Sequence, residues 1–309
     1  MYASLSKVLS SGTRATAALR VAKSLSEYWR LTKPRIWGLL VFTGVVAMLV
    51  SYREVHETPS LFSLLVGGVA ITFGSASANV LTNYHDRDID GMMERTKSRP
   101  LPSGKIKPSN ALAFGASMAA FSILLSLSFN LLAAAFMSLG LLDNIVVYSL
   151  LLKRRSWLNI ILGGVSGGMP VLVGYSAVAN TVTPIALYMS ALVIVWIPTH
   201  IWSLAITYKE DYKAAKVPML PVVFGERTAA VCIAGTSALL AAFSAAIFLF
   251  TSVSLFYTVS ATVLGGTILA YSVKLAIDKK QDTAWTLFKL TSPYLMLIFL
   301  VVVLDLWFF

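Results

Sequence analysis

The sequence predicts an all-α, polytopic membrane protein in which nine transmembrane helices form one bundle. Of its 309 residues, 57% are hydrophobic and only 13% are charged, about half the charge of a typical soluble domain. The mean hydropathy is +0.76, and apolar runs long enough to span a bilayer recur from residue 36 to the C-terminus. The alternating pattern of a membrane β-barrel is absent, so we expect helices throughout.

Windows of about 20 residues place the nine expected helices along the chain. Lys33-Pro34-Arg35 opens the first helix, since proline is tolerated in a first helical turn. The last three are almost purely apolar and carry no chemistry of their own. The expected helices lie near residues 36–52, 61–83, 109–129, 131–152, 159–178, 183–206, 228–250, 253–273 and 284–307.

The basic residues lie almost entirely on one side of these helices. Of the 25 Lys and Arg residues, 23 fall in the N-terminal segment and the even-numbered loops. This bias predicts that the N-terminus and those loops are cytoplasmic. The net charge of +11 is therefore explained by the orientation of the protein in the membrane and does not indicate nucleic-acid binding. We expect a plasma membrane, with the mitochondrial inner membrane as the alternative, because both obey the same charge rule. The single cysteine, Cys232, excludes a disulfide within the chain.

Residues 1–32 form a basic N-terminal segment ahead of a membrane domain at residues 33–309. The segment has a single acid, Glu27, among five basic residues, Lys7, Arg14, Arg20, Lys23 and Arg30. Two interpretations stay open: a mitochondrial-type presequence, or a basic amphipathic segment on an anionic membrane surface. The shortness of the other loops favours the second.

The stretch Asn79–Pro100 gathers four of the fourteen acidic residues where the second helix leaves the bilayer. At about 100° per residue, four oxygen-bearing side chains share one helical face, at roughly 0°, 40°, 340° and 20°: Asn79, Asn83, Asp86 and Asp90. Asp88 points the opposite way. Such a stripe of oxygen ligands suits Mg²⁺. A charged, solvated loop between membrane helices is the alternative.

Basic side chains follow the acidic stripe and the fourth helix. Directly after the stripe come three basic residues that could bind the anion that a metal ion carries: Arg95, Lys97 and Arg99. The run Lys153–Arg155 supports a similar role, although positive-inside anchoring also explains it.

The fourth helix carries polar residues well inside the hydrocarbon. Asp143 is a functional candidate because an intramembrane carboxylate is costly. At α-helical spacing, Asn144, Tyr148 and Arg155 share one face.

The sixth helix brings a second carboxylate to the same end of the bundle. Relative to His200, the polar residues fall at roughly 300°, 340° and 20°: Ser203, Thr207 and Asp211. His200 is either satisfied by a neighbour or a ligand contact, and spacing alone leaves both readings open.

Two inner loops carry a resemblance to a known superfamily. NYHDRDIDGMMERTKSRPLPSG and YSLLLKRR resemble the intramembrane prenyltransferases that include the 4-hydroxybenzoate polyprenyltransferases. LTKPRI, THIWSLA and EDYKAAKVPMLPVVFGE look closest to the haem O synthase (protohaem IX farnesyltransferase) branch. The likeness runs from about Leu31 to Thr228. Thr82-Asn83 replaces the Asn-Asp of many members. Ala215 stands where a second Asp of the second motif is usual, a reduction that the haem O branch shares.

The resemblance implies an enzyme that transfers a farnesyl group from farnesyl diphosphate to the vinyl group of haem B, adds water and yields haem O. It implies a site at the cytoplasmic mouth, with Mg²⁺ as cofactor. It implies metal ligands Asn83, Asp86, Asp90 and Asp211; diphosphate-binding residues Arg95, Arg99, Lys153 and Arg154; and haem contacts among His200, Trp202 and His85.

Other functions compete with this one. A prenyltransferase for an aromatic or quinone precursor should retain the fuller second aspartate motif. A transporter often shows internal repeats and midplane charge, whereas here the acids gather at one mouth. The expected partners are the two substrates and membrane lipid, with hand-over of haem O to a haem A synthase or terminal oxidase, and no nucleic acid.

Overall fold

The computed structural model describes residues 22–308. Most of the basic N-terminal segment, and the choice between its two interpretations, therefore lies outside the described residues. Within them, nine helices are long and apolar enough to cross a membrane, which confirms the predicted number. The protein is an integral membrane protein of the predicted all-α class.

Each of the nine spans begins and ends within a few residues of its predicted bounds. The spans are α2 (Pro34–Glu54), α3 (Leu61–His85), α5 (Pro108–Leu127), α6 with the π-helix η1 (Leu131–Leu142 and Asp143–Leu152), α7 with α8 (Asn159–Leu162 and Val165–Ala179), α9 (Pro184–Thr207), α12 with the 3₁₀-helix η2 (Gly225–Ala245 and Ala246–Leu249), α13 (Leu255–Asp278) and α14 (Gln281–Phe308). The span of α6 and the π-helix η1 and the interrupted span of α7 and α8 both line the cavity described below.

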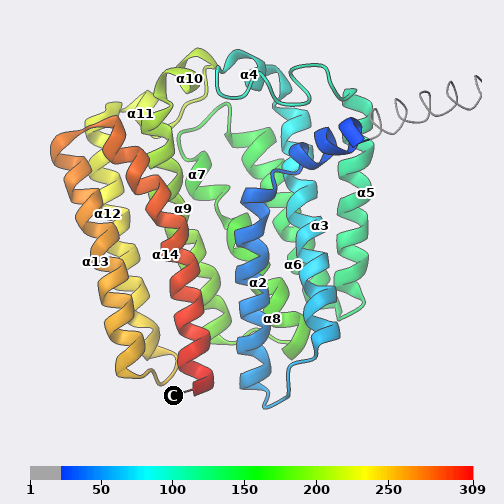
Figure 1. Cartoon of the computed structure of the whole chain (residues 1–309), viewed down its shortest axis with the longest axis vertical. Coiled ribbons are helices and arrows are strands. Elements are labelled where there is room, and N and C mark those ends of the chain that lie inside the picture. The colour runs from blue at the N-terminus through cyan, green and yellow to red at the C-terminus, as the bar shows by residue number, and fades with distance from the viewer. Residues whose placement is uncertain (1–21, 309) are drawn as a thin grey trace, which may run out of the picture.

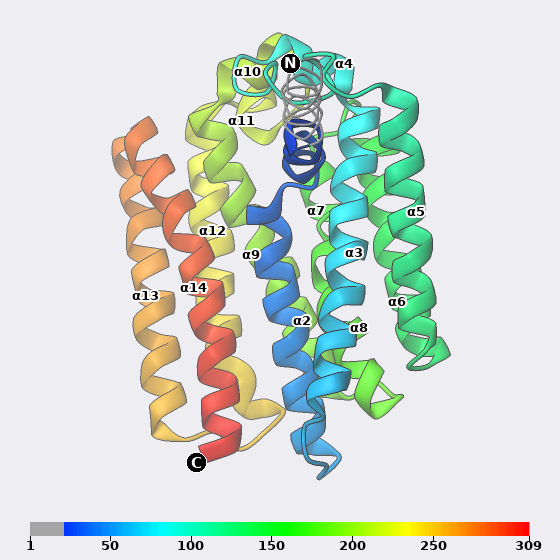
Figure 2. The same cartoon turned by 45° about the vertical axis from the view of Figure 1, so that its right-hand side comes forward.

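Three short helices gather at one end of the bundle, here called the loop end: α4 (Arg87–Met92), α10 (Lys209–Ala214) and α11 (Leu220–Val223). Figure 1 shows them at the top and the C-terminus at the opposite end, and Figure 2 shows the same arrangement after rotation. Helices α8 and α9 are the most enclosed of the spans. The charge bias predicts that the loop end is cytoplasmic, and this orientation stays a prediction.

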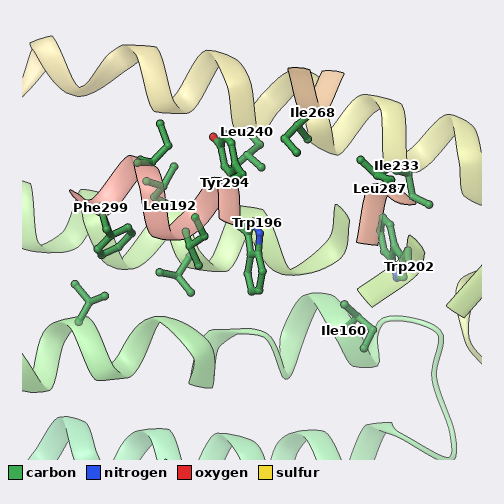
Figure 3. Packing of buried hydrophobic residues seen from close by; sticks show 14 of the residues in the cluster. Ile160, Leu192, Trp196, Trp202, Ile233, Leu240, Ile268, Leu287, Tyr294 and Phe299 are labelled. Carbon is green, nitrogen blue, oxygen red and sulfur yellow. The ribbon is translucent and has the colours of Figure 1, made fainter. Parts of the chain in front are cut away.

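The core runs mainly along α9 and α14. Figure 3 shows this packing, with Trp196 from α9 and Tyr294 from α14 among its labelled side chains. The Trp196 indole donates a hydrogen bond of 2.7 Å to the Thr291 carbonyl, which ties the two helices together. On the other flank, α2 crosses α8 so closely that a Cβ on Gly174 would lie 2.1 Å from the Gly44 carbonyl oxygen. Only glycine permits this approach.

The chain just before α2 packs into the domain. Residues 22–31 are helical, and Leu31 is completely buried with Val80, Leu101 and Ile106. Asn79 and Asn83 on α3 donate hydrogen bonds to the carbonyls of Thr32 (3.1 Å) and Leu31 (2.9 Å). The last residues of the N-terminal segment thus help to hold the predicted acidic face.

Candidate active site

The acidic stripe continues across an interruption of the helix that carries it. Helix α3 ends at His85, and Asp86 forms the junction with α4. Backbone hydrogen bonds from Asp86 to Thr82 (2.9 Å) and from Asp90 to Asp86 (2.8 Å) keep the helical spacing across the junction. Asn83, Asp86 and Asp90 are 3%, 1% and 2% exposed, whereas the Asp88 side chain is 60% exposed. This confirms the prediction that Asp88 points away from the face that Asn83, Asp86 and Asp90 share.

Each acid of the stripe pairs with a predicted diphosphate-binding cation. Lys153 donates a hydrogen bond to Asp86, and Arg99 forms an ion pair with Asp90 at 2.7 Å. Arg154 binds both oxygens of Asp88, at 2.6 and 2.7 Å. These hydrogen bonds lower the pKa of the Asp88 carboxyl to about 2. The structure thus brings three of the four predicted cations to the carboxylates at the loop end.

Two buried oxygens of the stripe have no hydrogen-bond partner: Oδ1 of Asn83 and Oδ1 of Asp86. A buried polar atom without a partner indicates a ligand, ion or water that completes it. Amide and carboxylate oxygens are hard ligands of the kind that Mg²⁺ binds. The residues present therefore fit a Mg²⁺ ion.

Asp211 lies apart from this pair of oxygens. Its carboxylate accepts hydrogen bonds from the backbone N–H groups of Glu94 (3.2 Å) and Arg95 (3.1 Å). Among residues 22–308, no three His, Cys, Asp or Glu side chains are grouped closely enough to hold a metal ion. Asp211 as a fourth metal ligand stays a prediction, and the structure does not bring it together with Asp86 and Asp90.

Arg95, the fourth predicted cation, faces aromatic rings instead of a carboxylate. Its guanidinium lies over the rings of Tyr208 and Tyr212, 5.0 and 6.0 Å from their centroids.

A cavity of about 580 Å³ opens beneath the loop end. Its polar lining includes Lys33, Asn79, Asn144, Tyr148, Lys153 and Asn159. Its remaining walls are mostly apolar or aromatic, with Leu39, Phe136, Ile160, Trp196, Ile197 and Phe288. This combination suits an amphipathic ligand with an anionic head and a hydrocarbon body.

The π-helix corrects one sequence expectation. A π-helix bonds residues five apart, and the Lys153 N–H donates to the Tyr148 carbonyl at 2.8 Å. Lys153 rather than Arg155 therefore lines the cavity with Asn144 and Tyr148, and Arg155 is exposed. The predicted face was wrong because it assumed α-helical spacing. Asp143, at the start of the π-helix, accepts a 2.8 Å hydrogen bond from the Ser166 backbone.

The three predicted haem contacts have different surroundings. His200 lines the cavity, stacked between Trp196 and Phe288 with ring centroids 4.4 Å away on both sides. Its Nδ1 lies 2.7 Å from the Thr291 hydroxyl, which fixes the ring. Trp202 is 3% exposed and packs in the core (Figure 3). Neither Trp202 nor His85 is among the described residues that line the cavity.

Two cavity residues were absent from the predicted site. The sequence favours a positive-inside anchor at Lys33, with anion binding as the less favoured alternative, whereas the structure places Lys33 in the cavity lining. Asn159 is fully buried, and its Oδ1 has no partner. Its position at the start of an expected span gave no sign of this surrounding.

Comparison with known proteins identifies the family. Residues 40–301 match the UbiA prenyltransferase family. The chain belongs to this family. Among its UbiA-family relatives, a protoheme IX farnesyltransferase of Thermoplasma volcanium is 42% identical over 278 residues, which cover 90% of this chain and 96% of the relative. Another, of Desulforudis audaxviator, is 43% identical over 283 residues, which cover 91% and 88%.

Solved UbiA-type structures share the fold. A digeranylgeranylglyceryl phosphate synthase matches with a TM-score of 0.74 and 19% identity, over 92% of this chain and 99% of the other. A UbiA homologue from Archaeoglobus fulgidus, bound to DMAPP and Mg²⁺, matches with a TM-score of 0.67 and 19% identity, over 90% and 99%. At this identity the likeness establishes the fold alone.

Proposed function

We propose that this protein transfers the farnesyl group of farnesyl diphosphate to the vinyl group of haem B, with addition of water, to give haem O. Its similarity to proteins named protoheme IX farnesyltransferase, at 42% and 43% identity over nine-tenths of the chain, carries the proposal. The cavity supports it, because a polar mouth leads to apolar walls, as an isoprenoid diphosphate requires. Haem is substrate and product here, not a prosthetic group.

Mg²⁺ would be held by Asn83, Asp86 and Asp90 through their buried oxygens. When bound, Mg²⁺ neutralises diphosphate charge and stabilises diphosphate as a leaving group. Support for the metal also comes from the Archaeoglobus fulgidus homologue, which binds Mg²⁺ together with DMAPP or GPP.

The chain's own cations would bind the diphosphate oxygens. Lys153 already lines the cavity, and Arg99 and Arg154 stand beside it at the loop end, with Arg95 as the fourth. Their charge-assisted hydrogen bonds strengthen as negative charge develops on the departing oxygen. The bond between that oxygen and C1 of the farnesyl group breaks, and the terminal vinyl carbon of haem forms a bond to C1. Water then adds to the neighbouring carbon and loses a proton to the released diphosphate.

The haem would lie against the aromatic wall of Trp196, His200 and Phe288. Of the three residues predicted to contact haem, we retain His200, because it lines the cavity and its ring is held by Thr291. The apolar walls would restrict water near the reacting carbons, so that a positioned water molecule adds instead of bulk solvent.

We place the protein in a plasma membrane, because the relatives come from archaea and bacteria. The product would pass within that membrane to a haem A synthase or terminal oxidase.

The test uses purified protein in lipid with farnesyl diphosphate, Mg²⁺ and either haem B or 4-hydroxybenzoate as acceptor. Prenylation of haem B and not of the hydroxybenzoate is the expected outcome. Prenylation of the hydroxybenzoate alone would move the acceptor to the aromatic class. If a folded protein transfers the farnesyl group to neither acceptor, both prenyltransferase hypotheses are contradicted. The transporter alternative is then favoured.

A further inference from the structure

We propose that Thr82, Asn144 and Ser166 form a polar group, here called the hydration cluster, that holds the water molecule which adds to haem. The inference rests on the proposed function, because it assigns the second half of that reaction to named side chains. Bond formation at C1 leaves a positive charge on the vinyl carbon next to the macrocycle. Addition of water to that carbon gives the alcohol, whereas loss of a proton from the adjoining CH₂ carbon would give an alkene.

The three residues of the hydration cluster come from three helices, and all of them line the cavity. Thr82 lies on α3, Asn144 on η1 and Ser166 on α8. The Thr82 hydroxyl donates a hydrogen bond of 2.9 Å to Oδ1 of Asn144. Nδ2 of Asn144 lies 3.5 Å from the Ser166 hydroxyl oxygen, at the long limit of a hydrogen bond. These contacts join the side chains into one polar group inside the membrane-spanning bundle.

The hydration cluster has the hydrogen-bonding capacity that a water molecule needs. The Thr82 hydroxyl donates to Asn144, and the Ser166 hydroxyl donates to the Gly163 carbonyl at 2.8 Å. Since a hydroxyl oxygen also carries two lone pairs, both oxygens can still accept from water, and the Asn144 amide has a second N–H to donate. A buried water molecule typically makes about three hydrogen bonds. Acceptors that bind its hydrogens leave an oxygen lone pair for attack on the positive carbon.

A carboxylate holds one member of the cluster in place. Asp143 accepts a hydrogen bond of 2.8 Å from the backbone N–H of Ser166, and it directly precedes Asn144 in the sequence. The contact therefore ties the start of α8 to the start of η1, the two segments that carry Ser166 and Asn144. An intramembrane carboxylate is costly, and this contact makes Asp143 a positioning residue for the cluster.

The hydration cluster lies one helical turn deeper in the bundle than the site for the diphosphate. The Asp86 N–H donates to the Thr82 carbonyl at 2.9 Å, and four residues of helix rise about 6 Å. On η1, Asn144 likewise precedes the cavity-lining Lys153. C1 of the farnesyl group is bonded to a diphosphate oxygen, so the reacting carbons have to lie between these charged groups and the apolar walls. Water on the cluster would lie at their level.

The aromatic wall and the hydration cluster come from different helices. Trp196 and His200 lie on α9 and Phe288 lies on α14. Figures 1 and 2 show α3 and α14 on opposite sides of α2. A haem plane stacked on the aromatic wall would therefore turn its other face toward α3. The water molecule would approach the vinyl carbon from that face.

Hydrogen bonds between membrane helices also contribute to packing, and this is the competing explanation for the cluster. If the three side chains only join the helices, their removal lowers stability and leaves the products unchanged. The ratio of hydrated to unhydrated product separates the two explanations. It is set after the farnesyl bond has formed, so it does not depend on how much folded protein is present.

The test measures that ratio by mass spectrometry of the pigment, after purified protein in lipid has reacted with haem B, farnesyl diphosphate and Mg²⁺. Thr82→Val and Asn144→Leu replace a polar side chain by an apolar one of similar size, and Thr82→Ser keeps the hydroxyl. Thr236→Val is the matched control. Its hydroxyl lies 2.9 Å from that of Thr199 and joins α12 to α9, and in the part of the chain that the structure describes neither residue lines the cavity.

We expect Thr82→Val and Asn144→Leu to lower the ratio of hydrated to unhydrated product at least about tenfold, because water loses a hydrogen-bond partner and proton loss competes. The unhydrated product is lighter than the hydrated one by one water molecule. Thr82→Ser should keep the wild-type ratio within about twofold. Thr236→Val should keep the ratio as well, while its unfolding temperature in detergent falls.

A wild-type ratio in both Thr82→Val and Asn144→Leu would overturn the inference. Complete loss of farnesyl transfer in these variants, with folded protein, would also overturn it, because the side chains would then act before water adds. If Asn144→Leu does not fold, Thr82→Val and Ser166→Ala decide by the same ratio. A wild-type protein that transfers no farnesyl group to haem would contradict the proposed function and the inference together, whereas normal transfer with an unchanged ratio contradicts the inference alone.

Discussion

Lys153 donates a hydrogen bond to Asp86, and this contact joins the end of η1 to the junction of α3 and α4 across the cavity mouth. Lys153 lines the cavity, whereas Asp86 is almost completely buried. One oxygen of Asp86 is thus bound by an ammonium group, and the other has no hydrogen-bond partner and lies 4.0 Å from the Arg154 guanidinium. The pair places a cation for the diphosphate beside an oxygen for the metal ion.

The two buried acids of the stripe should be indispensable. Asp86→Asn or Asp90→Asn removes a negative charge from the proposed Mg²⁺ site, and turnover should fall by at least about 10²-fold while the protein stays folded and inserted. Farnesyl transfer and thermal unfolding in detergent check this. Asp88→Asn is the matched control, because the Asp88 side chain is exposed and pairs with Arg154 away from the buried stripe. Its effect should be much smaller, and equal damage in all three variants would contradict the division of the faces.

Lys33 should make diphosphate binding depend on pH. Burial, followed by repulsion from Arg99, lowers the pKa of Lys33 to about 7. A bound anion favours the charged form, so affinity should weaken as the pH rises above 7. In Lys33→Arg the side chain stays charged, and the rise in the Michaelis constant for farnesyl diphosphate between about pH 6 and pH 8 should be flatter. Parallel profiles for the two proteins would remove Lys33 from diphosphate binding.

Substitutions of His200 and Trp202 should have different effects, the first on haem binding and the second on core packing. His200→Ala removes the stacked ring from the cavity wall, and haem affinity, followed by the Soret band in a titration, should fall about tenfold. Trp202→Phe alters a buried side chain outside the cavity lining, so it should lower thermal stability and leave haem affinity within about twofold. The reverse pattern would place the haem on the other face of α9.

The contact of α2 with α8 should tolerate no side chain. Gly174→Ala places a Cβ against the Gly44 carbonyl, and we expect a destabilisation of about 1–3 kcal/mol, seen as a lower unfolding temperature in detergent. Gly38→Ala on α2 is the control, since its Cβ would meet nothing within 4 Å. Equal unfolding temperatures for Gly174→Ala and Gly38→Ala would show that the two helices can separate at little cost.

Hydropathy and spacing alone predicted the nine spans and the shared face of Asn79, Asn83, Asp86 and Asp90. Both follow from local rules: apolar length decides a span, and helical period decides a face. Those rules hold across the junction at Asp86 because its backbone hydrogen bonds keep the helical spacing.

Other features depend on tertiary contacts that no local pattern encodes. The π-helix changes the spacing, so that Lys153 lines the cavity where α-helical spacing predicted Arg155. Asp211 binds backbone groups more than one hundred residues earlier in the chain. Trp202 follows His200 by only two residues, yet it packs in the core instead of the cavity. Pairing between distant loops and a change of helix type therefore set the limit of prediction from the sequence.

The most direct test of farnesyl transfer to haem is a mass measurement on the pigment. Purified protein in lipid is given haem B, farnesyl diphosphate and Mg²⁺ in ordinary or ¹⁸O-labelled water. We expect the pigment to gain one farnesyl group and one hydroxyl group, with the label in that hydroxyl. An unchanged haem mass, with folded protein and intact farnesyl diphosphate, would contradict the proposed function.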